Sequence, residues 1–472
     1  MDREATMKCG LEIHVQVETK SKLFCRCPTN YSEVPPNTNI CPVCIGLPGA
    51  RPMPPNKKAI DIAIMVAKML NCEIVLNRDI YFQRKHYDYP DLPSGYQRTT
   101  VPIGIDGKFL DIGIAEVHLE EDPGQYKPDL GLVDYNRSGI PLIEIVTEPD
   151  ISSPEEAREF LKQLMRLFRY IGHLRGEGTM RVDVNISVNY NGIQGNRVEV
   201  KNVNSIKGVY KVLKYEFIRQ KNILKRGGEV KRETRGFMES QMITRGMRTK
   251  ETAEDYRYIP DPDILPIVIE ERWVKEVESQ MPETPLEKEK RFVREYGIKE
   301  EDAKVLVSDL ALAEVFEKVV QDLGLEERNV NLAVTWIRNE LKRVLAYNKI
   351  DFLESNLKPE HLTELIRLIN DNVISQKIAK KVIEIMVEQR GSKSPREIVE
   401  EMGLTVITED DVLLKACEEA IKNNPKAVKD YLEGNKVALH FLMGQVMKLT
   451  RGRAEPKKVV KILKEKLDSN RS

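Results

Sequence analysis

Residues 9–17 read Cys-Gly-Leu-Glu-Ile-His-Val-Gln-Val, and this stretch decides the fold class of the N-terminal half. Apolar and polar side chains alternate along it. The apolar set is Leu11, Ile13, Val15 and Val17, and the polar set is Glu12, His14 and Gln16. Alternation with a period of two is typical of a strand with one buried face, as in antiparallel sheets.

Further strands follow along the chain. Residues 180–189 repeat the alternation, with five apolar residues from Met180 to Val188. Shorter candidates are Gly113–Glu120, Pro141–Thr147 and Arg197–Lys201. Together these segments predict an antiparallel sheet assembled from strands that are far apart in the sequence.

Helices are predicted between the strands and then throughout the C-terminal part. Segments beginning after Asn56, Ser153 and Ser205 carry helix start signals, and Gly172 ends the second one. The composition changes near residue 282, and nearly everything beyond is helical. We therefore predict an α+β protein. Its predicted parts are an N-terminal domain with an antiparallel sheet (residues 1–290), an all-helical domain (291–405) and a small helical tail domain (406–472).

Composition excludes several classes of protein. The 472 residues contain 74 Lys+Arg and 74 Asp+Glu. No run of about 18 apolar residues is present, so we expect no transmembrane helix and no membrane partner. Seven cysteines in a long chain without an export signal predict a cytoplasmic, reducing location.

Two segments are locally basic on this neutral chain. Residues 207–250 hold 13 Lys/Arg against 4 Asp/Glu, a local charge of +9. Residues 421–472 hold 13 against 5, a local charge of +8. Two such surfaces suit a long anionic partner such as a nucleic acid, and ordinary solvated helix faces are the alternative.

The polar faces of the predicted strands are rich in metal-ligand side chains. Glu12 and His14 are two residues apart, so both point to one side, roughly 7 Å apart along the strand. The other strands contribute Glu116, His118 and Glu120, then Asp183 and Asn185, then Glu199 and Lys201. Such a set suits Mg²⁺ with bound phosphates. A solvated acidic sheet face would show the same pattern.

Two other segments carry candidate sites. Residues 84–98 are aromatic, charged and interrupted by proline, which favours a loop that lines a site, with Arg84 and Lys85 as phosphate partners. The alternative is a plain surface loop. Cys25, Cys27, Cys41 and Cys44 form a C-x-C-x13-C-x-x-C pattern that predicts a structural Zn²⁺ site, with unmetallated thiols as the alternative. No P-loop and no G-x-S-x-G elbow occurs.

Several long motifs are similar to one family. They lie at residues 10–16, 84–93, 118–122, 134–150, 199–205 and 444–454. They resemble the B subunit of the tRNA-dependent Glu-tRNA(Gln)/Asp-tRNA(Asn) amidotransferase, and the resemblance covers essentially the whole chain. It implies a cradle-shaped first domain that holds an activation site, followed by helical and tail domains that bind tRNA.

The resemblance also implies a reaction and partners. The B subunit would use ATP and Mg²⁺ to phosphorylate the side-chain carboxylate of Glu or Asp misacylated on tRNA(Gln) or tRNA(Asn). Ammonia would come from the glutaminase, which is the A subunit, in a complex that also contains the small C subunit. The acyl phosphate would then yield Gln-tRNA(Gln) or Asn-tRNA(Asn), so the chain would belong to a ligase.

The resemblance carries over Glu12, His14, Glu120, Glu121, Glu144 and Glu199 by position, and strand parity puts only one of Glu120 and Glu121 on the face of Glu12. Lys85, Lys201, Asp183 and Asn185 are added from the polar strand faces and from residues 84–98. Glu12, His14, Glu120, Glu121 and Glu144 are the expected Mg²⁺ ligands. The residues expected to bind the nucleotide are Lys85, Asp183, Asn185, Glu199 and Lys201. We expect catalysis to depend on Glu12, His14, Lys85, Glu120, Glu121 and Lys201.

Three alternatives remain open from the sequence. The archaeal relative of the B subunit has an insertion before its helical region, which the short linker near residue 285 disfavours. A tRNA-binding scaffold without chemistry would explain the basic segments but not the acidic strand faces. A generic metal-binding protein would explain the Glu, His and Cys residues but not the long motifs.

Overall fold

The computed structural model describes the chain except residues 1–4, 88, 176, 248–256, 406–409, 434, 436, 451 and 470–472. It divides into two compact units, Met1–Thr284 and Pro285–Ser472. The first unit is built on a sheet and the second is helical, which confirms the α+β fold class. The further division of the helical part at residue 405 stays a prediction.

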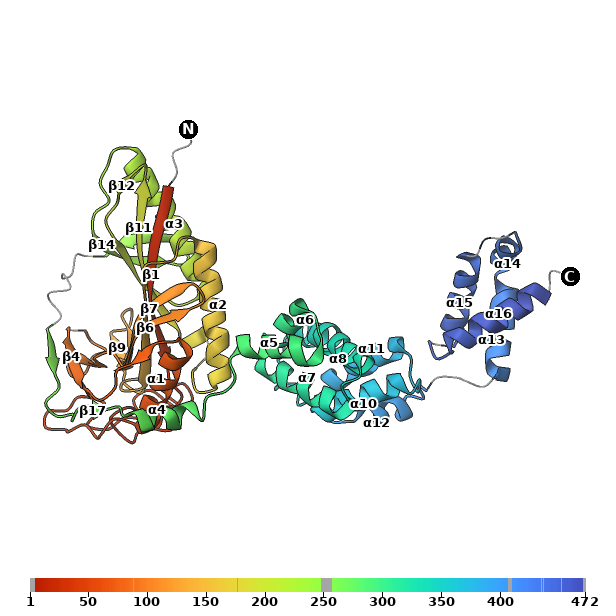
Figure 1. Ribbon diagram of the computed structural model, residues 1–472, viewed down its shortest axis with the longest axis horizontal. Helices are drawn as coiled ribbons and strands as arrows, with labels where there is room; N and C mark the ends of the chain where they lie inside the picture. Colours follow the sequence, from red (N-terminus) through yellow and green to blue (C-terminus); the bar gives the residue numbers. More distant parts are fainter. Residues whose placement is uncertain are drawn as a thin grey trace. The chain divides into compact units, whose positions relative to one another are not determined.

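A large sheet runs through the first unit (Figure 1). Its main path is β15-β14-β13-β11-β1-β10-β7-β5-β4-β16, with β6 also on β7, β2 on β6 and β12 on β11. The strands of this sheet are β1 (Ala5–Gln16), β2 (Glu73–Ile74), β4 (Phe82–His86), β5 (Tyr96–Thr100), β6 (Gly104–Phe109), β7 (Ile112–Glu121), β10 (Pro141–Thr147), β11 (Arg181–Tyr190), β12 (Ile193–Gln194), β13 (Val198–Val203), β14 (Glu233–Met238), β15 (Ile243–Gly246) and β16 (Tyr258–Pro260).

Two small two-stranded sheets accompany it. They pair β3 (Asp79–Ile80) with β17 (Ile267–Val268) and β8 (Gln125–Lys127) with β9 (Leu132–Asp134). The pairs of the large sheet are antiparallel, as predicted, except that β13 and β14 run parallel. A parallel pair needs a crossover connection, and helix α3 (Ile206–Lys225) supplies it here.

One face of the sheet is the hydrophobic core of the unit. The apolar residues of β1 and β11 are buried there together with those of the first three helices. Helices α1 (Lys57–Met69) and α3 contact the sheet, and α2 (Pro154–Ile171) packs along α3 (Figure 1). The apolar residues of each strand thus face the helices, and the polar residues that alternate with them lie on the other face of the sheet.

The three helices begin where the sequence indicated, and the second ends at the predicted Gly172. Asn56, Ser153 and Ser205 each accept a backbone hydrogen bond from the first turn of their helix, which satisfies a donor that has no intrahelical partner. Gly172 ends α2 with φ of 70°, a left-handed conformation that favours glycine. A short 3₁₀ turn, Glu177–Thr179, follows α2, and α4 (Glu271–Glu278) packs against α1.

Residues 84–98 differ from the single loop that we expected. Arg84 to His86 belong to β4 and Tyr96 to Arg98 belong to β5, and the two strands pair as a hairpin. Both prolines, Pro90 and Pro93, lie in the connection between the strands, where no ladder hydrogen bond is needed. The polar residues at the strand ends therefore occupy fixed positions in the sheet.

The second unit consists of helices. They are α5 (Pro285–Tyr296), α6 (Glu300–Leu306), α7 (Leu310–Leu323), α8 (Glu327–Val334), a π-helical segment (Thr335–Leu341), α9 (Lys342–Asn348), α10 (Pro359–Asn370), α11 (Gln376–Glu388), α12 (Pro395–Glu401), α13 (Asp410–Asn423), α14 (Pro425–Leu432), α15 (Val437–Leu449) and α16 (Pro456–Ser469). Residues 413–467 have a hydrophobic core cluster of their own. Among the described residues, no helix is long and apolar enough to cross a membrane.

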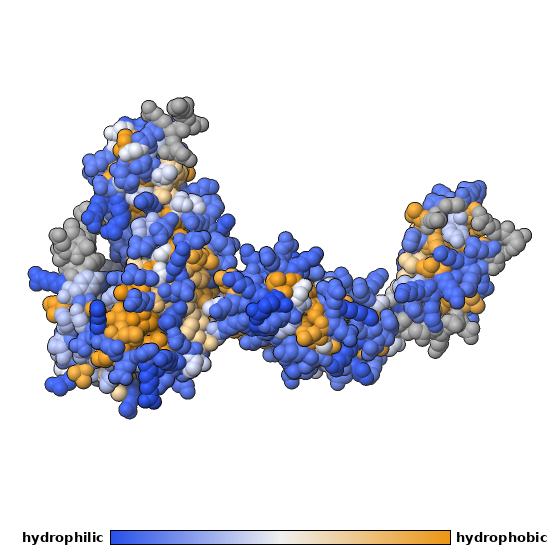
Figure 2. Space-filling model, in the orientation of Figure 1, coloured by the Kyte–Doolittle hydropathy of each residue, from blue (hydrophilic) through white to orange (hydrophobic). Residues whose placement is uncertain are grey.

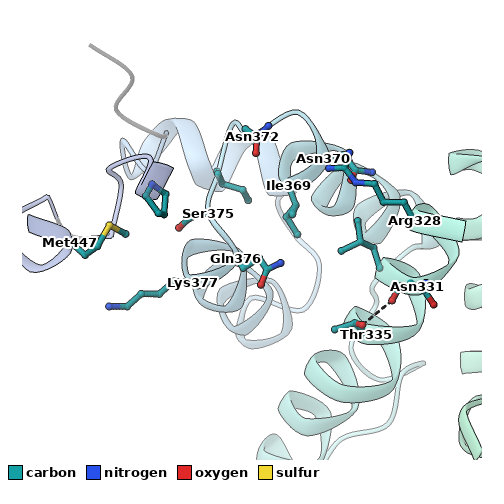
Figure 3. A pocket seen from close by; sticks show the side chains of 13 residues that line it. Arg328, Asn331, Thr335, Ile369, Asn370, Asn372, Ser375, Gln376, Lys377 and Met447 are labelled. Atoms are coloured by element: carbon teal, nitrogen blue, oxygen red, sulfur yellow. Dashed lines mark hydrogen bonds between the residues drawn. The ribbon is translucent and has the colours of Figure 1, made fainter. Parts of the chain in front are cut away.

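The visible faces are mostly hydrophilic, with hydrophobic patches on each unit (Figure 2). A pocket in the second unit is lined by residues of α8, α10 and α11, including Arg328, Asn331 and Lys377 (Figure 3). None of its described lining residues is Asp, Glu, His or Cys. Within the described residues, the clusters of His, Cys, Asp and Glu that could hold a metal ion lie in the first unit.

Candidate active site

The polar face of the sheet gathers its charged residues through the strand register. His14 on β1 is opposite Glu144 on β10, and Glu144 is opposite His118 on β7. Directly opposed residues share a face, and residues two apart along a strand share it too. Glu12 and Glu120 therefore point to the same side as this row.

His14 is the centre of a first group of metal-ligand side chains, which we call the His14 group. Its Nε2 lies 3.4 Å from Oε1 of Glu144 and 3.5 Å from Oε2 of Glu120. The three residues can offer ligand atoms that all lie within 4.8 Å of one another. Oε1 of Glu120 is buried and has no hydrogen-bond partner among the described residues. A buried carboxylate oxygen without a partner is costly unless a cation takes that place.

The charges of this group perturb one another. Burial alone would lower the pKa of His14, but the hydrogen bonds and charges of Glu120 and Glu144 outweigh burial and raise it well above its usual value. Burial tends to raise the pKa of Glu144, yet the hydrogen bond and charge of His14 hold it well below its usual value. The group is thus a concentrated, charged cluster, a feature common at functional sites.

A second group of carboxylates lies on the same face, and we call it the Glu12 group. Glu12 is opposite Asp183 in the register, and Glu199 joins them from β13, with ligand atoms again within 4.8 Å of one another. Asn185 donates from Nδ2 to Oε1 of Glu12 at 2.9 Å. Burial and then the charges of Glu144, Asp183 and Glu199 raise the pKa of Glu12.

Two lysines balance these acidic groups. Lys201 lies 3.0 Å from Glu199 and 3.7 Å from Asp183, in the Glu12 group. Lys85 is opposite Gln97 on β5, and the charges of Glu120 and Glu144 raise its pKa against the effect of burial. Both are cations that face the carboxylates, which is where a bound polyphosphate would need them.

Glu121 is the predicted site residue that the structure does not bring to either group. It follows Glu120 in β7 and so points to the opposite face, where it lies 3.2 Å from Arg98. Arg98 also donates to Asp261 at 2.8 Å, and Asp261 accepts from Arg84 at 2.9 Å. Glu121 and Arg84 are therefore joined through Arg98 and Asp261 in one ion network.

Sequence reasoning missed Gln97, which contacts the site. Gln97 donates from Nε2 to Oε2 of Glu120 at 3.0 Å and to the carbonyl of Glu121 at 2.9 Å. Gln97 shares a face with Lys85 by hairpin pairing, but nothing in the sequence pairs residue 97 with residue 120.

The four cysteines come together in a separate place. Cys25, Cys27, Cys41 and Cys44 can offer sulfur atoms within 4.8 Å of one another, which is the arrangement that a tetrahedral Zn²⁺ site requires. The pKa of Cys44 is lowered to about 5, first by a hydrogen bond from Cys25, and the charge of Lys22 acts in the same direction. The thiols fit a closed site with four protein ligands.

Comparisons with known proteins agree with this architecture. Residues 7–275 match the GatB/GatE catalytic domain, and residues 314–467 match the GatB domain. A protein of Methanococcus aeolicus is 76% identical over 465 residues, which are 98% of this chain and 99% of that protein. It is named as the B subunit of aspartyl/glutamyl-tRNA(Asn/Gln) amidotransferase. This chain belongs to the family of amidotransferase B subunits.

Other members of the B-subunit family match over the same length. A protein of Methanocaldococcus jannaschii with the same name is 74% identical, covering 98% of each chain. One of Methanothermobacter thermautotrophicus is 58% identical, covering 98% of this chain and all of its own length. The family membership makes the chain part of a tRNA-dependent amidotransferase, a ligase, and replaces the generic metal-binding alternative.

Proposed function

We propose that this B subunit of the amidotransferase activates the side-chain carboxylate of Glu or Asp carried by misacylated tRNA(Gln) or tRNA(Asn). The carboxylate oxygen attacks the γ-phosphorus of ATP, and the bond between that phosphorus and the β,γ-bridging oxygen breaks. The products of this step are ADP and an acyl phosphate. Ammonia then attacks the acyl carbon, inorganic phosphate leaves, and a proton is lost to give Gln-tRNA(Gln) or Asn-tRNA(Asn).

The observation that carries this proposal is the pair of ligand groups on one sheet face, with a lysine beside each. Phosphoryl transfer depends mainly on positioning and on charge neutralisation. Mg²⁺ held there would neutralise the transferring phosphoryl group. The donor set fits: three carboxylates in the Glu12 group, two carboxylates and an imidazole in the His14 group, and an unpartnered oxygen on Glu120.

The residues have distinct roles in this proposal. Glu12, His14, Glu120 and Glu144 would bind Mg²⁺, and Gln97 would keep the Glu120 carboxylate in place through its amide. Lys85 and Lys201 would contact phosphate oxygens. Asp183, Asn185 and Glu199 would complete the nucleotide side of the face, while Glu121 would act only through Arg98.

Partners and the second metal complete the proposal. Ammonia is expected from the glutaminase, which is the A subunit of the complex, and the small C subunit is the third component. The basic segments 207–250 and 421–472 would contact tRNA. The four cysteines would hold a structural Zn²⁺, which leaves no open coordination position for chemistry.

A phosphate-transfer experiment tests the proposal. The chain is assembled with its A and C partners and incubated with Mg²⁺, [γ-³²P]ATP and Glu-tRNA(Gln), without glutamine. Label on the aminoacyl-tRNA that depends on the glutamyl group is the expected result. Tight tRNA binding without any label would instead support a scaffold role.

A matched pair of variants locates the activity in this chain. Lys85→Met should lose transfer of label, because a cation next to Glu120 and Glu144 is removed. Lys20→Met removes an exposed lysine of the same unit and should keep the label. Equal loss in both variants would contradict the assignment of Lys85.

A further inference from the structure

Lys22 is a buried lysine that the proposed reaction does not use. It is 1% exposed and belongs to the largest fully buried side chains in the described part of the protein. It lies next to the cysteine pattern, three residues before Cys25. A lysine is seldom buried without a partner, because the charge must be compensated inside the protein.

The contacts of the Lys22 ammonium point to the cysteine site. Nζ donates to the carbonyl of Asn39 at 2.9 Å, to the carbonyl of Tyr135 at 3.2 Å and to Sγ of Cys44 at 3.4 Å. Within the described residues, no carboxylate forms an ion pair with it. The sulfur is therefore the one neighbour in this set of contacts that can carry a negative charge.

The charge of the cysteine site explains why a buried cation is present. Four thiolates around a divalent ion carry a net charge of −2, whereas four neutral thiols carry none. Neutral thiols would leave the Lys22 ammonium as an uncompensated charge in the interior. Four metal-bound thiolates would compensate the charge of the Lys22 ammonium. The metal, the four thiolates and Lys22 together would then carry a net charge of −1.

We propose that Lys22 is the counter-cation of a metal-bound Cys44 thiolate and that it ties the metal site to the loop of residues 134–140. This inference rests on the proposed Zn²⁺ at the four cysteines. It assigns to Lys22 a positioning role, since the ammonium lies outside the ligand set. Partners of metal ligands contribute substantially to metal affinity in this way.

The loop of residues 134–140 is bonded to the cysteine segment at several further points. Ser138 donates from Oγ to the carbonyl of Cys44 at 2.8 Å, and the amide of Leu23 donates to the carbonyl of Gly139 at 2.8 Å. The amide of Asn39 donates to the side chain of Asn136 at 2.8 Å. The loop leads directly into β10, which carries Glu144. The hydrogen-bonded loop therefore connects the cysteine segment to a strand of the His14 group.

Zinc content and zinc release from the full-length chain test the proposal. Wild type is expected to hold one zinc per chain. Lys22→Met should release zinc to a colorimetric chelator about 10–100-fold faster than wild type, the range by which such partners affect metal affinity. Lys20→Met, an exposed lysine two residues away, is the matched control and should release zinc like wild type.

The outcomes separate this inference from the zinc proposal beneath it. Wild type with zinc and Lys22→Met with unchanged release would overturn the role of Lys22 and leave the zinc site standing. Wild type without a bound metal would overturn both. Zinc release that is faster in Lys22→Met, unchanged in Lys20→Met and intermediate in Lys22→Arg would support both proposals.

A measurement on wild type keeps the test decisive even where Lys22→Met does not fold. Hydrogen exchange is compared between the zinc-loaded and the chelator-stripped protein. Amides of residues 134–140, such as that of Gly139, which donates to the Asp122 carbonyl, should exchange faster after stripping. Residues of β11 serve as the internal control. Equal protection of the loop in both states would contradict the coupling.

Discussion

The two kinds of metal-ligand site in residues 5–284 are built in opposite ways. The His14 and Glu12 groups take their ligands from strands β1, β7, β10, β11 and β13, far apart in the sequence, and offer mainly oxygen atoms. The cysteine site takes four sulfurs from 20 residues, Cys25 to Cys44. The first arrangement suits hard cations that keep waters and bind phosphates, and the second suits a closed zinc site.

This contrast separates activity from stability. Carboxylates that repel one another cost stability when no cation is bound, and in the proposed activation step they would hold Mg²⁺. Thiolates around the proposed zinc would hold the loops that border the sheet face. Substitutions in the two sites should therefore change different measured quantities, and the following tests proceed from the largest expected effect to the smallest.

Glu120→Gln should lower transfer of label to aminoacyl-tRNA by at least about 100-fold, comparable to the loss of a key charge-stabilising group. The carboxylate that faces His14 is removed, while the amide keeps the volume. Glutaminase activity of the assembled complex should remain, since it belongs to another polypeptide in this account. Rapid label transfer by this variant would contradict the assignment of the His14 group.

The matched control is Glu18→Gln, two residues beyond the end of β1. Its side chain is exposed and lies outside both ligand groups. We expect wild-type transfer of label from this variant. A comparable loss would show that the effect of Glu120→Gln is not specific to the site.

Cys41→Ser should act mainly on stability. The loss of one thiolate ligand removes zinc, and loss of a structural metal costs about 4 kcal/mol in the free energy of unfolding. Zinc content and thermal unfolding of the purified chain measure the effect. Cys72→Ala, a buried cysteine outside the group, should keep the zinc. Full zinc content in Cys41→Ser would exclude the four-cysteine site.

Asp261→Asn tests the ion network behind the carboxylate face. The side chain of Asp261 is fully buried between Arg84 and Arg98, and breaking such a buried pair costs about 3–5 kcal/mol. Asp263 also pairs with Arg84 but is 45% exposed, so Asp263→Asn should cost at most about 1 kcal/mol. Equal unfolding temperatures for the two variants would contradict the network.

The same network predicts a pH dependence. Burial tends to raise the pKa of Asp261, but hydrogen bonds from Arg84 and Arg98 lower it below its usual value. A lowered pKa contributes stability above the unfolded-state value of about 3.9, and this is lost as the pH falls through the folded-state value. The difference in unfolding temperature between wild type and Asp261→Asn should therefore shrink below about pH 4.

Glu12→Gln should have a smaller effect on stability than Asp261→Asn, and of the opposite sign. Without divalent cations it should raise the free energy of unfolding by about 0.5–2 kcal/mol, because one of three crowded carboxylates is neutralised. Added Mg²⁺ should stabilise wild type and reduce this difference. Thermal unfolding with and without Mg²⁺ measures it. A lower unfolding temperature of Glu12→Gln than of wild type without Mg²⁺ would contradict the repulsion among the three carboxylates.

The sequence predicted the polar face through local alternation. The parity of β1 put Glu12 and His14 on one side, and the four cysteines were grouped because 20 residues contain them all. The register was beyond prediction, since the opposition of His14 and Glu144 depends on strands 130 residues apart. Strand parity allowed only one of Glu120 and Glu121 on the face of Glu12, and the structure turns Glu120 to His14 and Glu121 to Arg98.

The contact of Gln97 with Glu120 also depends on tertiary structure. Gln97 comes from β5, which pairs with β7 through Thr99 opposite Glu120. The strand order β7-β5-β4 places Lys85 and Gln97 on the carboxylate face, although β6 separates β5 from β7 in the sequence. Pairing of strands that are not sequence neighbours cannot be deduced from periodicity alone.

The most direct test of the two-site account is anomalous diffraction from crystals of the full chain soaked in Mn²⁺ as a substitute for Mg²⁺. Data are collected at the manganese and zinc absorption edges. We expect a manganese peak beside His14, Glu120 and Glu144 and a zinc peak among the four cysteines. A crystal with zinc at the cysteines and no manganese on the carboxylate face would contradict the proposed activation site.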